Sequence, residues 1–227
     1  MSLFEMNGVE RHYEMPSGVV KALDGIDMSV EEGERVILLG PSGSGKTTLL
    51  NCLSALDSPT GGTYKFGGQE VPRDNSEAMT KFRRDNIGYV FQFFNLLQDL
   101  TVLENVLLIQ ELAGGKDVQR AKELLSMVGL SEEVDRFPGE ISGGQQQRVA
   151  IARSLSKSPR LLLGDELTGN LDSETSASVM EALIASCEKE NITAVFVTHD
   201  EKLTKYATRV IRLDSGKIIS DETTQKA

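Results

Sequence analysis

Residues 40–48 read Gly40-Pro41-Ser42-Gly43-Ser44-Gly45-Lys46-Thr47-Thr48, and this stretch decides the fold. The apolar run 35–39 before it is typical of a buried strand, and 48–56 after it has the pattern of a helix. A strand, a glycine-rich loop and a helix in this order predict a phosphate-binding loop, because glycines let backbone N–H groups turn inward around an anion. In such a loop Lys46 bridges the outer phosphates and Thr47 offers its hydroxyl to Mg²⁺. The alternative is a glycine-rich turn before an ordinary helix.

The composition limits the classes of function. The chain has 227 residues, 39% of them hydrophobic, and a formal net charge of −10. This length predicts one large domain, or one domain with an insert. The acidic balance, without a block rich in lysine or arginine, argues against a nucleic-acid surface. No apolar run approaches the roughly 18 residues of a membrane span, and the first residues lack a secretory pattern. Cys52 and Cys187 fall in predicted helices, which favours core thiols over a disulfide.

The rest of the chain alternates between strands and helices. Strands are predicted at 3–13 and 19–30, on either side of a turn at 16–18, and a short hairpin at 63–71 turns at Gly67-Gly68. Other predicted elements are a helix at 76–86, strands at 87–91, 161–166 and 193–197, a helix at 173–190, and a closing hairpin of 208–213 with 216–221.

Residues 101–156 have a helical pattern throughout. Thr101 and Glu104 form a capping-box pattern, and the apolar positions of 117–128 repeat at helical spacing. Because this stretch interrupts a chain of strands and helices, we interpret it as an inserted helical subdomain.

Ser142-Gly143-Gly144-Gln145 opens the last helix of that insert. Ser142 and Gln145 satisfy the capping pattern, so the simplest interpretation is a well-capped helix start. A glycine-rich helix N-terminus with a serine hydroxyl can also hold an anion.

Polar side chains follow two apolar strands. Asp165 and Glu166 end the strand at 161–166, where an aspartate beside a phosphate loop suits Mg²⁺ and a glutamate can polarise water. His199 follows the strand at 193–197, where it is either structural or within reach of a γ-phosphate. The alternative for the carboxylates is a strand that ends in a charged turn. The apolar pair Phe93-Phe94, just after Gln92, is either core or a surface that a partner covers.

Taken together, these motifs resemble the nucleotide-binding subunit of ATP-binding-cassette transporters, and they occur in the order of that family. The resemblance covers nearly the whole chain and rests on 40–47, Gln92, 142–145, 165–166, 170–172 and His199. The serine-glycine-glycine-glutamine element distinguishes this family from other phosphate-loop enzymes. The stretches 99–106, 143–153 and 168–172 are similar to ATPases of the macrolide-export and lipoprotein-release group.

The resemblance implies a RecA-like phosphate-loop NTPase core of class α/β with a mixed sheet. It also implies an N-terminal antiparallel β subdomain and an inserted all-helical subdomain. The chain would form a single domain, 1–227. Residues 1–92 and 157–227 would make the nucleotide-binding core with the β subdomain. Residues 93–156 would make the helical subdomain, which carries the family's signature motif, Ser142-Gly143-Gly144-Gln145.

The resemblance also implies roles for individual residues. Glu166 is the expected catalytic base, His199 the γ-phosphate switch, Gln92 a contact to Mg²⁺ and the attacking water, and Lys46 a catalytic phosphate ligand. Asp165 and Thr47 are expected beside Mg²⁺ with Gln92. The expected nucleotide-binding residues are Tyr13 (which stacks on adenine), Gly40, Pro41, Ser42, Gly43, Ser44, Gly45, Lys46, Thr47, Thr48, Gln92, Ser142, Gly143, Gly144, Gln145, Asp172 and His199.

The sequence departs from the family pattern at Leu167, where the family usually has proline. Leucine leaves the backbone of Glu166 freer, so the sequence predicts that Leu167→Pro raises the basal turnover.

The implied activity is ATP hydrolysis with ATP and Mg²⁺ as cofactors. The implied partners are a second copy of the chain, in an ATP-dependent homodimer, and an integral membrane permease, with no nucleic acid. The expected location is cytoplasmic, on the inner face of the cell membrane. A soluble ATPase of this class in DNA repair or translation is the alternative, and it would normally carry coiled-coil arms or two cassettes. A third interpretation is a regulatory cassette that does not hydrolyse ATP, but the presence of Glu166 and His199 argues against it.

Overall fold

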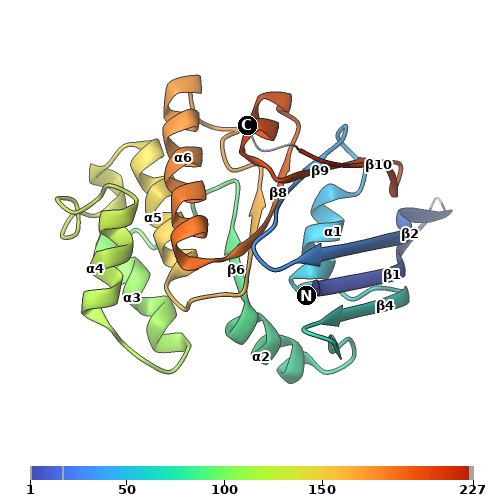
Figure 1. Cartoon of the computed structure of the whole chain (residues 1–227). Helices are drawn as coiled ribbons and strands as arrows, with labels where there is room; N and C mark the ends of the chain where they lie inside the picture. The colour runs from blue at the N-terminus through green and yellow to red at the C-terminus, as the bar shows by residue number, and fades with distance from the viewer. Residues whose placement is uncertain (1, 17, 225–227) are drawn as a thin grey trace. The chain divides into compact units, whose positions relative to one another are not determined.

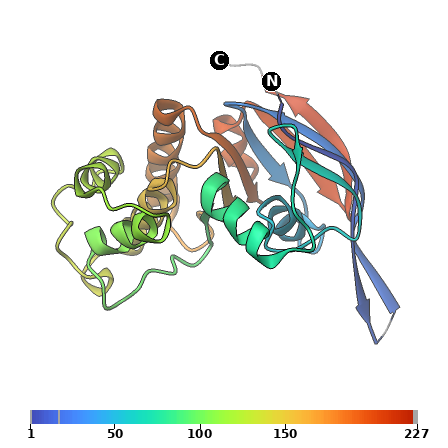
Figure 2. The same cartoon turned by 90° about the horizontal axis from the view of Figure 1, so that it is seen from below.

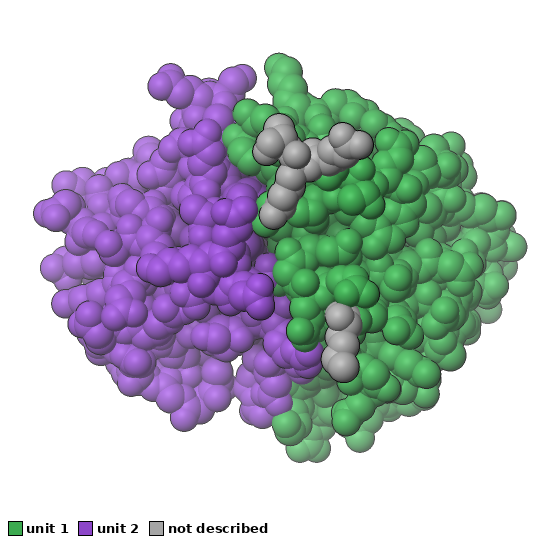
Figure 3. Space-filling view, in the orientation of Figure 1, with its two compact units in different colours: residues 1–83, 193–227 green, residues 84–192 purple. Residues whose placement is uncertain are grey.

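The computed structural model describes residues 2–16 and 18–224 (Figure 1; Figure 2 shows the view from below). The chain divides into two compact units, coloured separately in Figure 3. Unit 1 consists of 1–83 and 193–227, and unit 2 consists of 84–192. These boundaries differ from the predicted ones at 92 and 157, because the strands at 87–90 and 161–165 and the helix at 173–190 group with the helical segment. The predicted division into core and helical subdomain stays a prediction.

Unit 1 contains a four-stranded antiparallel sheet. Its order is β2 (Gly18–Glu31), β1 (Ser2–Met15), β4 (Gly61–Phe66) and β5 (Gln69–Glu70). Burial alternates along β2, where Ile26, Met28 and Val30 face the core and the residues between them are exposed. This period of two is the one expected for a sheet with one solvated face. The predicted N-terminal antiparallel β subdomain is therefore confirmed.

The β1–β2 pair extends beyond the rest of this sheet as a two-stranded ribbon (Figure 2). β1 pairs with β4 only from Phe4 to Glu10, whereas its pairing with β2 continues to Met15 opposite Gly18. Ser17, in the predicted turn at 16–18, lies outside the described residues. The ribbon contains Tyr13, the predicted adenine-stacking residue.

The other strands of unit 1 lie in the order β10 (Lys217–Thr223), β9 (Arg209–Asp214), β3 (Arg35–Leu39) and β8 (Thr193–Thr198). β3 runs parallel to both β8 and β9, and β10 is antiparallel to β9. β3 and β8 are almost entirely buried, as strands of a parallel sheet covered on both faces should be. The remaining elements that begin in this unit are α1 (Lys46–Leu53), α2 (Ser76–Asn86) and η2 (Glu201–Tyr206).

Unit 2 contains the parallel strands β6 (Ile87–Val90) and β7 (Leu161–Asp165) and most of the helices. These are α3 (Val102–Leu112), α4 (Val118–Met127), η1 (Pro138–Glu140), α5 (Gly143–Leu155) and α6 (Ser173–Glu190). α5 contacts α3, α4 and α6 and buries Val149, Ala150 and Ile151, so it is the central helix of this unit (Figure 1).

Most predicted elements are confirmed to within two residues. The clearest difference is α1, which begins at Lys46 inside the loop and ends at Leu53, whereas the sequence predicted 48–56. It ends early because Ser54 caps it and Ala55 then adopts a left-handed backbone, with φ of 53°. No helix among the described residues is long and apolar enough to cross a membrane. Cys52 and Cys187 are buried free thiols, as predicted.

Candidate functional site

The phosphate-binding loop connects β3 to α1 and packs on backbone from two other segments of unit 1. Gly45 is the N-cap of α1 with φ of 103°, and a Cβ at this position would lie 2.3 Å from the carbonyl oxygen of Ala22 in β2. The N–H of Gly216, in the β9–β10 turn, donates to the carbonyl of Ser44 over 3.0 Å. Only glycine fits both the backbone angle and the space at position 45. The shape of the phosphate-binding loop therefore requires glycine at position 45.

Lys46 lies over the loop. Its Nζ donates to the carbonyls of Gly40, at 2.7 Å, and Pro41, at 2.9 Å, and only 8% of the residue is exposed. The buried Oγ of Ser44 has no hydrogen-bond partner among the described residues. A buried hydroxyl without a partner costs stability, so it marks a place for an acceptor that the protein atoms do not provide. The cation, this hydroxyl and the helix N-terminus together fit a bound polyphosphate.

Strand register aligns the predicted switch histidine with this loop. Leu39 of β3 pairs with Thr198 of β8 in parallel, so Gly40 and His199 follow at the same edge of the sheet. His199 is exposed, as is Thr47 at the start of α1, while Thr48 is half-buried. Pro41, Ser42 and Gly43 form the exposed outer part of the loop. Unit 1 thus contains the predicted phosphate ligands of the loop together with His199, the predicted switch histidine.

Tyr13 is held by two neighbours that the sequence did not indicate. Its hydroxyl donates to Asp57 Oδ2 over 2.7 Å, and the guanidinium carbon of Arg11 lies 4.4 Å from its ring centroid. Partial burial, and then the hydrogen bond to Asp57, raise the pKa of the Tyr13 phenol above its usual value. The one available signal was the spacing, because Arg11 and Tyr13 lie two residues apart on one strand and share a face.

In unit 2, the carboxylates and Gln92 follow two parallel strands. Val90 of β6 pairs with Gly164 of β7, so Gln92 and Asp165 lie at the same edge. Burial, and then the charge of Asp165, raise the pKa of Tyr89 on the neighbouring strand. Gln92 and Asp165 therefore share one edge of these two strands, and the role of Asp165 at Mg²⁺ stays a prediction.

Glu166 begins a tight turn after β7. Its φ of 47° is left-handed, and its carbonyl accepts from the N–H of Gly169 over 3.1 Å. The side chain of Asn170 donates to the carbonyl of Gln92 over 3.3 Å. This bond joins the turn to the segment that carries Gln92, a role that the sequence did not indicate for Asn170.

The signature residues start α5. Ser142 is its exposed N-cap: its Oγ accepts from the N–H of Gln145 over 3.3 Å, and its own N–H donates to Gln145 Oε1 over 2.9 Å. This capping box confirms the simpler sequence interpretation. The side-chain amide of Gln145 also donates to Glu133 over 3.0 Å, so Gln145 has a structural function besides the predicted one.

Gly144 allows α5 and α6 to approach each other closely. A Cβ at Gly144 would lie 2.3 Å from Thr175 Cγ2 in the first turn of α6. A Cβ at Gly143 would lie 3.6 Å from Phe94 Cζ and 3.8 Å from Leu171 Cδ2. The signature therefore packs against the start of α6 and against the apolar segment after Gln92.

Asp172 is the N-cap of α6. It accepts hydrogen bonds from the hydroxyl of Thr175, at 2.6 Å, and from the backbone N–H groups of Thr175 and Glu174. The hydrogen bonds from the Thr175 side chain and backbone lower the pKa of Asp172. The carboxylate thus has a clear structural role on an exposed surface.

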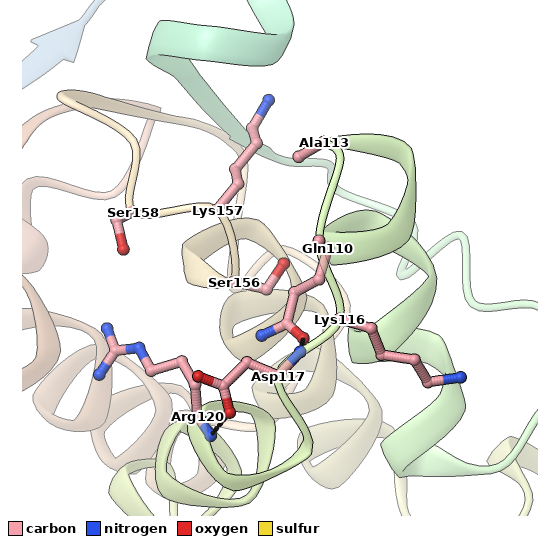
Figure 4. A pocket seen from close by; sticks show the side chains of 9 residues that line it. Gln110, Ala113, Lys116, Asp117, Arg120, Ser156, Lys157 and Ser158 are labelled. Atoms are coloured by element: carbon pink, nitrogen blue, oxygen red, sulfur yellow. Dashed lines mark hydrogen bonds between the residues drawn. The ribbon is translucent and has the colours of Figure 1, made fainter.

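Unit 2 also has an open pocket of about 460 Å³, away from these motifs in the sequence (Figure 4). Its polar groups largely bind one another. The N–H of Asp117 donates to Gln110 Oε1, the N–H of Arg120 donates to Asp117, and the Arg120 guanidinium pairs with Glu190. These satisfied groups do not point to a ligand.

Comparison with known proteins agrees with this geometry. The family model described as ABC transporter matches residues 23–169. The chain belongs to this family. It is 47% identical to the lipoprotein-releasing system ATP-binding protein LolD of Geobacter metallireducens over 223 residues, which cover 97% of the chain and 99% of that protein. It is 42% identical to the macrolide export ATP-binding/permease protein MacB of Photorhabdus laumondii over 99% of the chain and 35% of that protein.

Solved structures of ABC cassettes have the same fold. The dimeric structure of a post-hydrolysis state of the cassette MJ0796, bound to ADP and Pi, has a TM-score of 0.88 and 38% identity, and the match covers 98% of this chain and 99% of that one. The predicted family and fold class are thereby confirmed, and the chain is an ABC-type ATPase. The roles of its individual site residues stay predictions.

Proposed function

We propose that this chain binds and hydrolyses ATP as the energy-supplying subunit of an ABC transporter of the lipoprotein-release or macrolide-export type. The observation that carries the proposal is the loop at 40–48, in which Lys46 covers the glycine-rich backbone and Ser44 keeps a buried hydroxyl without a partner among the described residues. Both features suit a polyphosphate. The similarity to LolD over nearly the full length of both chains supports the narrower assignment.

The chain contains a residue of suitable chemistry for each role in ATP hydrolysis. Lys46 neutralises the outer phosphates, while Thr47, Asp165 and Gln92 offer oxygen ligands to Mg²⁺. Mg²⁺ supplies charge neutralisation at the phosphates when it is bound. Glu166 accepts a proton from the attacking water, which then adds to the γ-phosphorus as ADP leaves. His199 donates a hydrogen bond to the γ-phosphate and reports its presence.

The signature acts on a second copy of the chain. Ser142 is exposed and starts a helix, so its hydroxyl and the N-terminus of α5 are available to the γ-phosphate of another subunit. A two-fold dimer then holds two composite sites. The dimeric MJ0796 cassettes support this arrangement. ATP favours the closed dimer, and hydrolysis allows the dimer to open. The bound nucleotide therefore shifts the populations of the closed and open states.

A membrane permease uses that shift. The segment after β6 exposes apolar side chains, with Phe93 67% and Leu97 48% exposed. Phe94 is different, because it is half-buried and packs near Gly143. We assign Phe93 and Leu97 to the docking surface for a cytoplasmic segment of the permease, which holds the subunit at the inner face of the membrane.

The test of ATP binding is Lys46→Met, with Lys65→Met, an exposed lysine of β4, as the matched control. The Lys46 variant should lose ATP binding and turnover while its melting temperature stays near that of the parent chain. The control should keep both. Normal ATP turnover in the Lys46 variant would refute the proposal.

A further inference from the structure

Arg11, Tyr13 and Asp57 form a closed cluster in unit 1. The Nε of Arg11 donates to Asp57 Oδ2 over 2.8 Å, and its Nη2 lies 2.8 Å from Oδ1, so the pair is bidentate. The Tyr13 hydroxyl donates to the same carboxylate over 2.7 Å, and the guanidinium covers one face of the ring at 4.4 Å. Arg11 and Asp57 side chains are each 23% exposed, so the cluster is partly shielded from solvent. Bidentate pairs and cation–π stacking both fix geometry.

Asp57 ties this cluster to the helix that begins at the phosphate loop. The backbone N–H of Asp57 donates to the carbonyl of Asn51 in α1 over 3.1 Å, and Asp57 Oδ1 accepts from the N–H of Ser58 over 2.8 Å. After the left-handed residue Ala55, the N–H groups of both Leu56 and Asp57 donate to the carbonyl of Asn51. The Tyr13 ring is thus anchored to α1 as well as to its own strand. The position of the Tyr13 ring relative to the phosphate-binding loop therefore does not depend on the two-stranded ribbon alone.

Arg11 covers one face of the Tyr13 ring, so a planar ligand would have to stack on the opposite face. Tyr13 is half-buried, and its neighbour across the ribbon, Val20, is 50% exposed. We propose that Arg11 and Asp57 are positioning residues that hold Tyr13 as the platform for the adenine base, with Arg11, Tyr13 and the base stacked in that order. This inference rests on the proposed function. Arg11 and Asp57 act through Tyr13 and do not touch the phosphates.

The competing explanation is an ion pair that only fastens β1 to α1. The two explanations predict different changes in affinity for ligands with and without an adenine base. A platform for the base affects ATP but not inorganic tripolyphosphate, which has the phosphates alone. A purely structural pair affects both ligands equally, through the stability of the fold.

The test is the affinity of the full chain for two probes, a non-hydrolysable imido analogue of ATP and inorganic tripolyphosphate, each measured by calorimetry with Mg²⁺. Arg11→Met should weaken binding of the ATP analogue by about three- to fivefold, the effect expected from a lost cation–π contact and ion pair. Binding of tripolyphosphate should not change. Arg73→Met is the matched control, because Arg73 also pairs with a carboxylate and its side chain is 25% exposed. It should change neither affinity.

Tyr13→Ala separates this inference from the proposed function. It should weaken binding of the ATP analogue by about tenfold or more, since stacking of one base on an aromatic ring contributes that much to affinity. Arg11→Met should have no further effect in the Tyr13→Ala background. If Tyr13→Ala changes nothing, Tyr13 is not the platform, and the role assigned to Tyr13 fails. The positioning role fails if Tyr13→Ala weakens binding of the ATP analogue but Arg11→Met does not. It also fails if Arg11→Met weakens binding of both probes equally.

Arg11→Lys keeps the proposal testable if Arg11→Met folds poorly. Lysine retains the charge but cannot make the bidentate pair or the planar stack. It should therefore lose part of the affinity for the ATP analogue and none for tripolyphosphate. Full affinity for both probes would contradict the stacked geometry.

Discussion

Ser142→Ala separates the structural role of the signature serine from its role in catalysis. The hydroxyl accepts one hydrogen bond in the α5 capping box, and the reciprocal bond from the Ser142 N–H to Gln145 remains after substitution. Loss of such a cap costs about 1 kcal/mol. For a chain of this size that lowers the melting temperature by about 2–4 °C. If the hydroxyl also binds a γ-phosphate in the dimer, a bond to a charged group worth about 1.5–3 kcal/mol is lost. That corresponds to a fall in turnover of about 10- to 150-fold.

The chain contains a matched control for this prediction. Thr101 caps α3 with the same reciprocal box, in which its hydroxyl accepts from the N–H of Glu104 over 3.2 Å. Thr101→Ala should lower the melting temperature as much as Ser142→Ala but leave steady-state ATP turnover almost unchanged. ATP affinity of the monomer should be normal in both variants. Equal losses of turnover in the two variants, or a large loss of monomer affinity in Ser142→Ala, would refute the role across the dimer.

Three further outcomes are expected. Leu167→Pro should lower both melting temperature and basal turnover, because Leu167 is only 4% exposed and Glu166 has a left-handed φ of 47°, whereas proline favours extended backbone at the preceding residue. Phe93→Ser should preserve melting temperature and basal turnover but weaken co-sedimentation with permease-containing membranes, whereas Phe94→Ser should lower the melting temperature. The pKa of Asp172 is depressed in the folded chain, so its contribution to stability is complete above the unfolded value of about 3.9 and is lost as pH falls through the lower folded value. Chemical denaturation of Asp172→Asn should therefore show a shallower decline in stability below that pH than the parent chain does.

Local sequence patterns predicted the elements that local interactions determine. The phosphate loop, the capping boxes at Thr101 and Ser142, and the helix at 76–86 all follow from spacing over a few residues. In the structure, the parallel pairing of β3 with β8 brings Gly40 and His199, which follow these strands, to the same edge of the sheet.

The features that the sequence did not predict depend on distant contacts or on backbone angles. Asp57 binds Tyr13 across 44 positions of the chain, and no local pattern indicates that contact. The early end of α1 depends on the left-handed angle of Ala55, a residue that rarely adopts it. Likewise, the φ of Glu166 and the burial of Leu167 reverse the expected effect of Leu167→Pro, because the sequence shows only the missing proline.

We expect ATP to join two copies of this chain, with the signature of each copy completing the nucleotide site of the other. The most direct measurement is the molar mass of Glu166→Gln in size-exclusion chromatography with light scattering, with and without ATP. The glutamine keeps the shape of Glu166 but cannot accept the proton, so bound ATP persists. The control is Glu181→Gln, an exposed glutamate of α6. Glu166→Gln should be a monomer without ATP and a dimer with ATP, and the control, which hydrolyses its ATP, should form no lasting dimer. A Glu166→Gln variant that binds ATP and remains a monomer would contradict ATP-driven dimerisation.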